Sequence, residues 1–316
     1  MARKGENEFV ARLEANIASV IKGKSESIRT MIIGLLARGH ILIEDVPGVG
    51  KTTLAQLLAR SISCSFRRIQ FTSDLLPSDI LGVSIYDRDK KEFQFKPGPI
   101  FANIVLADEI NRTTPKTQSA LLEAMNVAQV SMDGVTHPLP QPFMVIATQN
   151  PIEFHGTFPL PRSQMDRFLM RIRLGYPQPE YETVILKEQK TLGRVPIVEP
   201  VLTADEVQTM QEAVIQVKID DDLLDYITRA ATATRQSSRI ELGASTRGAL
   251  SLRQCAQARA YIEGRDYVIP DDIKQMIGPV WAHRIQLAQT FEGTGIGQHD
   301  DEEILKETVS QVEVPL

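Results

Sequence analysis

The stretch Ile41–Leu54, ILIEDVPGVGKTTL, decides the fold that the rest of the chain builds around it. A short run of branched apolar residues leads through a Pro/Gly turn into a segment with helical spacing, which predicts a strand, a loop and a helix. Gly48 and Gly50 let the loop turn its N–H groups inward, and Lys51 adds a positive charge at the N-terminus of the helix, where anions are already favoured. Thr52 can offer its hydroxyl to a divalent metal. The pattern indicates a P-loop that cradles the β- and γ-phosphates of a nucleotide.

One residue departs from the pattern G-x-x-x-x-G-K-[ST], because Asp45 stands where the first glycine is expected. Asp tolerates left-handed turn geometry, but its carboxylate must then point away from the phosphates. The second half of the loop follows the pattern. The residues expected to hold the phosphates are Pro47, Gly48, Val49, Gly50, Lys51, Thr52 and Thr53. A glycine-rich turn with a solvated lysine is the simpler alternative.

The composition indicates a folded protein whose length suits two domains. The chain has 316 residues, of which 42% are hydrophobic, so it can bury a large core. No stretch approaches the roughly 20 apolar residues of a membrane span, and the N-terminus lacks a signal-peptide segment, so we expect a cytoplasmic protein. Cys64 and Cys255 suggest neither a disulfide framework nor a zinc site. A formal net charge of −5 disfavours nucleic-acid binding by counterion release.

An acidic pair follows the next buried strand. Residues 104–108, IVLAD, form a continuous apolar run that closes on Asp108, with Glu109 directly after it. Such a run is typical of a strand buried on both faces of a parallel sheet, and ligands bind at the C-terminal ends of these strands. Asp108 and Thr52 would hold Mg²⁺, and Glu109 would orient or deprotonate the attacking water. A charged strand end that faces solvent is the alternative.

A polar amide ends another predicted buried strand, residues 143–148. Asn150 then lies at a strand tip beside the presumed site, where it could hydrogen-bond the γ-phosphate or the water. The alternative is a turn-forming Asn that precedes Pro151.

Two insertions are predicted to form β-hairpins. Apolar and polar residues alternate over Val83–Phe95 on either side of a polar turn, and Asp133-Gly134 is a turn signal within Val130–Val135. A surface excursion is the simplest interpretation. A charged hairpin inside a nucleotide-binding core is nevertheless a common place to meet a substrate or partner.

Several arginines lack an evident partner in the sequence. Arg162, Arg167, Arg171 and Arg173 form a local positive cluster, which is usually a solvated face. If the protein is a ring, an arginine here could enter the neighbour's site and stabilise charge on the transferred phosphoryl group. Arg247 stands in the first turn of a predicted helix, an unfavourable place for a cation unless an anion is near. It is therefore a candidate phosphate contact.

The chain beyond Tyr176 is predicted to be helical. Helices are expected at about 180–192, 203–217, 220–235, 245–263 and 270–288. We expect a nucleotide-binding core with an N-terminal helix over residues 1–176, a helical domain over 177–292 and a polar, acidic, mobile tail over 293–316.

Five motifs, in this order, resemble the MoxR family of AAA+ ATPases: EDVPGVGKTT, IVLADEINR, ATQNP, LPRSQMDRF and GASTRGA. The resemblance covers residues 8–285. It implies an α/β fold, with an αβα core around a parallel five-stranded sheet of order 5-1-4-3-2, the two hairpin insertions and a C-terminal all-α lid. It also implies ATP and Mg²⁺ as ligands. The implied roles are Walker A for Lys51 and Thr52, Walker B for Asp108 and Glu109, sensor 1 for Asn150, arginine finger for Arg167 and sensor 2 for Arg247.

The resemblance also implies partners. Members of this branch look like ring-forming, usually hexameric ATPases that work with von Willebrand factor A domain proteins to remodel or mature client proteins, often by inserting metal cofactors. Arg162 occupies a position where the family more often shows an acid, which leaves two candidate fingers. Arg167 is preferred because it lies in the DRF motif.

Three other functions compete with this interpretation. A helicase-like nucleic-acid motor would share both hairpins, but the acidic net charge and the lack of stacking aromatics beside basic residues disfavour it. A nucleotide switch without hydrolysis is disfavoured by the intact Asp108-Glu109 pair. The ATPase subunit of magnesium chelatase has similar motifs, so a metal-insertion client stays open.

Overall fold

Five parallel strands form the central sheet of the computed structural model, which describes residues 3–151, 156–188, 197–288 and 300–315. The strands are β1 (Ile41–Glu44), β2 (Phe66–Gln70), β5 (Ile104–Asp108), β8 (Met144–Gln149) and β9 (Met170–Ile172). Their order across the sheet is β2-β5-β8-β1-β9. If these five strands are numbered 1 to 5 along the chain, the order is 2-3-4-1-5. Read in the opposite direction, this is the expected order 5-1-4-3-2. The predicted α/β fold is confirmed.

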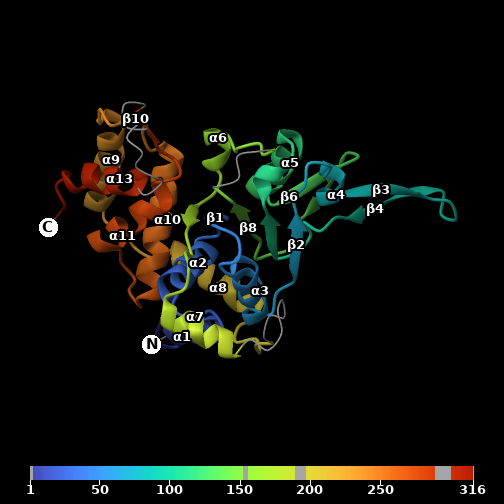
Figure 1. Ribbon diagram of the computed structural model, residues 1–316, viewed down its shortest axis with the longest axis horizontal. Coiled ribbons are helices and arrows are strands. Elements are labelled where there is room, and N and C mark those ends of the chain that lie inside the picture. Colours follow the sequence, from blue (N-terminus) through green and yellow to red (C-terminus); the bar gives the residue numbers. More distant parts are fainter. Residues whose placement is uncertain (1–2, 152–155, 189–196, 289–299, 316) are drawn as a thin grey trace.

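Helices cover both faces of the sheet because its central strands are apolar on both sides. Ile41 and Ile43 of β1 pack into one hydrophobic cluster with helices that include α2 and α3, whereas Leu42 faces a second cluster on the side of α5. The core helices are α1 (Arg3–Ala18), α2 (Ser25–Leu36), α3 (Lys51–Ser61), α4 (Pro77–Leu81), η1 (Ile110–Arg112), α5 (Pro115–Val127) and α6 (Arg162–Met165). The sheet is therefore the middle layer of an αβα sandwich (Figure 1).

Both predicted hairpins are present. One consists of β3 (Gly82–Asp87) and β4 (Glu92–Pro97), and the other of β6 (Gln129–Met132) and β7 (Val135–Pro138). Asp133 and Gly134 both take positive φ, as the turn signal requires. Phe95 stacks on His137 with 4.2 Å between ring centroids, so the two hairpins touch. The β3–β4 hairpin projects from the core on the side away from the C-terminal helices (Figure 1).

The C-terminal part is helical, as predicted. Its helices are α7 (Pro179–Glu188), α8 (Ala204–Ile215), α9 (Asp221–Gln236), α10 (Thr246–Ile262), α11 (Pro270–Trp281) and α13 (Asp300–Ser310), and β10 (Ile240–Leu242) pairs with β11 (Gln286–Leu287). The end of the first predicted helix, up to Leu192, lies outside the described residues. Gln211 of α8 donates to the backbone of Leu35 in the core, at 2.7 Å. The division at residue 176 stays a prediction.

Two expectations for the C-terminal part are wrong. The helix predicted over 270–288 ends at Trp281, because the buried Arg284 side chain binds Asp166 and the carbonyls of Phe168 and Leu169, which draws the chain out of the helix. The sequence predicts a mobile tail, but residues 300–310 of the tail form α13. Leu305 and Val309, one turn apart, are buried against the other C-terminal helices and fix α13 there.

Within the described ranges, no helix combines the length and the apolar character that crossing a membrane requires.

Candidate active site

The P-loop lies at the C-terminal end of β1, and its glycines have the conformation that the motif predicts. Gly48 and Gly50 take φ of +85° and +94°, in the region that glycine enters at little cost. A Cβ on Gly48 would meet no atom within 4 Å, so the space beside this glycine is open. Gly50 caps α3, and the Nζ of Lys51 donates to the carbonyl of Asp45 at 2.8 Å. The loop, the helix N-terminus and the lysine together have an arrangement that suits an anion.

Asp45, the residue that departs from the P-loop pattern, turns its carboxylate away from the loop, as expected. One oxygen accepts hydrogen bonds from the backbone N–H groups of Leu174 and Gly175, both at 2.6 Å. The other accepts from the N–H of Val46 at 2.9 Å. The carboxylate therefore ties the start of the P-loop to the chain that leaves β9, and it takes no place from a phosphate.

Asp108 is the last residue of β5, and it lies with the P-loop at the C-terminal edge of the sheet, which is the side formed by the C-terminal ends of the strands. Two neighbours hold its carboxylate. Thr148 of β8 donates to one oxygen at 2.6 Å, and the guanidinium of Arg68 on β2 donates to the other at 2.6 and 3.0 Å. Asp108 is buried, whereas about half of the Arg68 side chain is exposed. Arg68 thus compensates the charge of the carboxylate at the position expected for a metal ligand.

Glu109 stands immediately beyond the sheet, in a left-handed backbone conformation with φ of +59°. Its N–H donates to Thr148 at 2.8 Å, and its carboxylate accepts from Gln70 at 2.8 Å and pairs with Arg112 at 3.1 Å. A positive φ is uncommon for a residue other than glycine and is often found at functional sites. Glu109 is held from both sides, by β2 and by η1.

Asn150 completes this edge. It directly follows β8, which lies between β5 and β1 in the sheet, and its side chain is buried. The parallel topology therefore brings the P-loop, the acidic pair and Asn150 to one edge, since all of them follow the C-terminal ends of strands. Sequence reasoning placed these residues together, and the structure does so as well.

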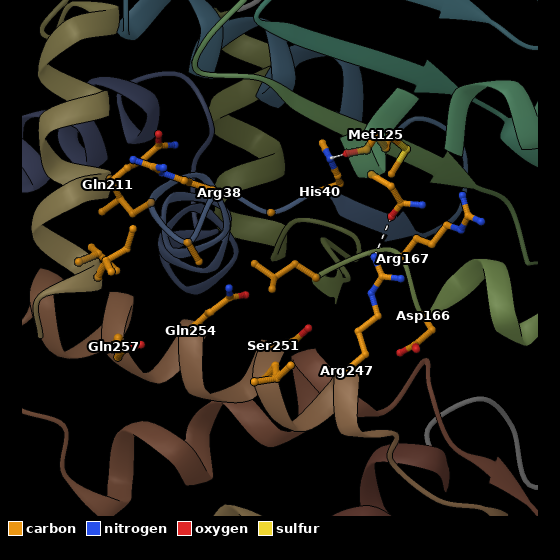
Figure 2. A pocket seen from close by; sticks show the side chains of 18 of the residues that line it. Arg38, His40, Met125, Asp166, Arg167, Gln211, Arg247, Ser251, Gln254 and Gln257 are labelled. Carbon is orange, nitrogen blue, oxygen red and sulfur yellow. Dashed lines mark hydrogen bonds between the residues drawn. The ribbon is translucent and has the colours of Figure 1, made fainter. Parts of the chain in front are cut away.

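Arg167 and Arg247 lie at the N-terminal edge of the sheet, which is the side formed by the N-terminal ends of the strands. Arg167 comes just before β9, in line with His40 before β1, because the N–H of Leu169 donates to the carbonyl of His40. Arg167 and Arg247 both line a cavity of about 420 Å³ between the core and α10. Figure 2 shows these two side chains beside Asp166 at one side of the cavity, with Gln211 and Gln257 at the other. The four residues of β1, at about 3.3 Å each, separate this cavity from the P-loop by roughly 13 Å.

Arg162, the second candidate finger, is placed differently from Arg167. Its guanidinium approaches the carbonyl of His283 at 3.4 Å, whereas that of Arg167 donates to the carbonyl of Leu122 at 2.9 Å. Arg162 does not line the cavity that holds Arg167 and Arg247. The structure therefore groups Arg167 with Arg247 and leaves Arg162 apart.

His40 supports the cavity wall as a neutral side chain. Burial lowers the pKa of His40 to about 4, although the hydrogen bond to the carbonyl of Met125 opposes this shift. Its Nδ1 accepts from the N–H of Val145 at 3.0 Å, and its Nε2 lies 2.9 Å from the carbonyl of Met125. The ring thereby joins the start of β1 to β8 and to the last turn of α5.

The residues at the P-loop edge suit a magnesium nucleotide. The open glycine loop and the α3 N-terminus fit phosphates, and the hydroxyl of Thr52 and the carboxylate of Asp108 are oxygen ligands of the kind Mg²⁺ prefers. Among the described residues, no group of three His, Cys, Asp or Glu side chains could hold a metal by itself. Mg²⁺ characteristically binds one or two protein oxygens together with substrate phosphates, so this sparse set is adequate.

Two residues of the site, Arg68 and Gln70, were not predicted from the sequence. Arg68 and Gln70 lie on β2, and they contact Asp108 and Glu109 because β2 pairs with β5 in register. The signal was available in the stretch FRRIQF, where polar residues stand near the end of a predicted strand. Using it required knowing which strand lies beside β5.

A P-loop at the switch between strand and helix, an acidic pair at the end of β5, two hairpin insertions and a helical lid define a nucleotide-binding ATPase core. The profile of the ATPase family associated with various cellular activities (AAA) matches residues 40–170, and that of the AAA lid domain matches residues 232–308. The second match extends into α13, so the helix at 300–310 is part of the lid.

Individual proteins agree with these profiles. Chaperone MoxR1 of Mycobacterium tuberculosis is 42% identical over 86% of this chain and 74% of its own, and Protein MoxR of Methylorubrum extorquens is 30% identical over 90% of each. YeaC of Bacillus subtilis, which is uncharacterised, is 48% identical over 95% of this chain and 93% of its own. A crystal structure from Cytophaga hutchinsonii, assigned as an ATPase, has a TM-score of 0.91 and 37% identity over 99% of this chain and 97% of its own. The chain belongs to the MoxR family of AAA ATPases.

Proposed function

We propose that this AAA ATPase hydrolyses ATP with Mg²⁺ at sites shared between the subunits of a ring, usually a hexamer in the family it resembles. The observation that carries the proposal is the separation of two half-sites on one chain. The P-loop, Asp108, Glu109 and Asn150 occupy one edge of the sheet, and Arg167 and Arg247 occupy the other. Since the length of β1 separates both arginines from the P-loop of their own subunit, we assign them to the P-loop of a neighbour.

The residues at the P-loop edge divide the work of binding and hydrolysis. Backbone N–H groups around Gly50 and the ammonium of Lys51 bind the β- and γ-phosphates, for which Lys51 leaves the carbonyl of Asp45. Thr52 and Asp108 would hold Mg²⁺, which supplies charge neutralisation on the phosphates when bound. Glu109 orients the attacking water and accepts its proton, and Asn150 hydrogen-bonds the γ-phosphate or the water.

The residues at the opposite edge act in trans. Arg167 and Arg247 approach the γ-phosphate bound by the adjoining subunit and stabilise the negative charge that develops there. This assignment makes assembly a condition for fast turnover. A cation is unfavourable in the first turn of a helix, where Arg247 stands in α10, unless an anion lies near. In this assignment the γ-phosphate of the adjoining subunit is that anion.

The work done by hydrolysis is proposed to be the remodelling or maturation of client proteins. The relative MoxR1 carries the name chaperone. The β3–β4 hairpin presents exposed Tyr86 and Phe93 as an edge-to-face pair, a surface suited to a polypeptide. A von Willebrand factor A domain partner and metal-cofactor insertion, as in magnesium-chelatase-type ATPases, follow from the family resemblance and belong to the same proposal, as does a cytoplasmic location.

A nucleic-acid motor is the second candidate, and one observation favours it. The exposed pair Tyr86 and Phe93 flanks a turn with three basic residues, so the expected lack of stacking aromatics beside basic residues is wrong. The same turn, residues 87–92 (DRDKKE), carries three acidic residues, so its formal charge is zero. A neutral turn attracts no phosphate backbone, and a protein client fits it better. A salt-dependent gel shift together with DNA-stimulated turnover would reverse this preference.

Turnover as a function of protein concentration tests the shared site. If hydrolysis requires the neighbour's arginines, ATP turnover per subunit rises with protein concentration, and it rises together with the molar mass measured in the presence of ATP and Mg²⁺. Full turnover by a species that light scattering shows to be a monomer would contradict the proposal.

A further inference from the structure

The C-terminal half of α5 contacts both arginines of the cavity. The carbonyl of Leu122 accepts from Arg167 at 2.9 Å, and the side-chain oxygen of Asn126 accepts from Arg247 at 2.7 Å. Residues four apart lie on one face of a helix, so these two acceptors are neighbours on α5. In Figure 2 the dashed line at Arg247 marks its hydrogen bond to Asn126 at one side of the cavity, and Arg167 lies close by. One helix of the core therefore positions an arginine of the core and an arginine of the lid.

Asn126 orients Arg247 without cancelling its charge. The amide is neutral, whereas Asp166, a carboxylate that lines the cavity, is engaged by Ser245 at 3.2 Å and by Arg284 at 2.7 Å. The N-terminus of α10 carries partial positive charge, which disfavours Arg247 there, and the C-terminal end of α5 carries the partial negative charge that offsets it. Arg247 is thus held in one orientation and keeps its full charge for an external anion.

Through α5, Asn126 is also connected to the C-terminal edge of the sheet in its own subunit, where Glu109 lies. The buried side chain of Gln118 in α5 donates to the carbonyls of Ile110 and Phe158, at 3.1 and 2.9 Å. Ile110 directly follows Glu109 and begins η1. The helix that holds Arg247 is therefore fixed to the segment that carries Glu109. A movement of Glu109 in the site of one subunit would be transmitted through α5 to Arg247, which serves the nucleotide of the neighbouring subunit.

We propose that Asn126 is a positioning residue for hydrolysis in the neighbouring subunit, which it supports by holding Arg247 in the orientation that meets the neighbour's phosphate. This inference rests on the proposed function, in which Arg247 acts in trans. Asn126 itself touches no substrate. Its side chain is exposed in the single chain, so its replacement leaves the core of α5 unchanged.

Steady-state ATP turnover of three variants tests the proposal. Asn126→Ala removes the hydrogen bond, and we expect kcat to fall about tenfold, the equivalent of one such bond, with KM for ATP unchanged. Asn126→Asp keeps an acceptor but neutralises Arg247, so we expect a loss at least as large. Glu123→Ala, an exposed change on the same helix outside the cavity, is the control and should leave turnover unchanged.

Two further measurements separate positioning from a structural role. In the Arg247→Ala background, Asn126→Ala should cost nothing more, because its only effect passes through Arg247. Mixing Asn126→Ala with Lys51→Ala subunits should restore turnover, since the Lys51 variant presents an intact Asn126–Arg247 pair to the neighbour's functional P-loop. An additive loss, or no rescue on mixing, would overturn the inference.

The failure of this inference can be told apart from the failure of the proposed function. Normal kcat for Asn126→Ala beside a strongly impaired Arg247→Ala would end the role of Asn126 alone. Normal kcat for Arg247→Ala would remove the trans role of Arg247 from the proposed function itself.

Discussion

The two edges of the sheet differ in how their polar side chains are satisfied. At the C-terminal edge, the acids already have cationic or amide partners within the chain, as Asp108 has Arg68 and Glu109 has Arg112 and Gln70. At the N-terminal edge, Arg167 and Arg247 are held by a backbone carbonyl and a neutral amide. In the proposed function, the first edge binds the nucleotide with its metal, and the positive charge of the second edge serves a nucleotide bound by another subunit.

The largest expected effect comes from the C-terminal edge. Lys51→Ala removes the ammonium that binds the β- and γ-phosphates, and we expect ATP binding and turnover to be lost. Binding of a fluorescent ATP analogue and phosphate release measure the two effects. Lys116→Ala, an exposed lysine on α5, is the matched control and should behave as the wild type. Tight nucleotide binding by the Lys51 variant would place the phosphates elsewhere.

Arg167→Ala tests the N-terminal edge. We expect ATP affinity to be kept, because the P-loop is intact, while kcat falls on the order of 10³, as for other arginine fingers. Single-turnover kinetics with a separate binding measurement distinguishes the two. Arg253→Ala, an exposed change on α10, is the control. Full activity of the Arg167 variant would refute a shared site.

Acid should weaken the N-terminal edge through His40. Burial lowers the pKa of His40 to about 4, whereas the pKa of a histidine in the unfolded chain is near 6.5. Between these two pH values the unfolded chain therefore binds a proton at His40 and the folded chain does not. Stability from this group is complete above pH 6.5 and is lost as the pH falls toward 4, by about 3 kcal/mol at most. Urea unfolding between pH 7 and 4.5 measures the loss. In a His40→Gln variant the slope should be shallower, and an unchanged slope would contradict the role of His40.

The smallest expected effect concerns Asp45. Asp45→Ala leaves the N–H groups of Leu174 and Gly175 without their acceptor, which should lower the free energy of unfolding by about 1–3 kcal/mol. Nucleotide affinity should change little, because the carboxylate points away from the loop. Asp89→Ala in the hairpin turn is the control. A large loss of affinity without loss of stability would mean that Asp45 contacts the nucleotide after all.

Much of the C-terminal edge was predictable from the sequence, because its parts follow short buried strands. A run such as IVLAD can be recognised as a strand, and the parallel topology then places Asp108, Asn150 and the P-loop together. The pairing of Arg68 with Asp108 was not predictable, because it depends on which strand lies beside β5. Local patterns do not carry that information.

The N-terminal edge was less predictable. Arg247 was singled out from its place in a helix, but its contact with Asn126 joins residues 121 positions apart. Helix α13 was missed because Leu305 and Val309, which are buried, stand among acidic residues that dominate the local composition. In both cases tertiary packing decided the outcome, and the sequence pattern alone could not reveal it.

Mixing two inactive variants tests the central claim most directly. Lys51→Ala subunits lack a working P-loop but present intact arginines, and Arg167→Ala subunits have a working P-loop but present a defective edge. If the site is shared between subunits, an equimolar mixture should regain turnover at about a quarter of the interfaces of a randomly mixed ring. A mixture no more active than its two components would contradict the shared site.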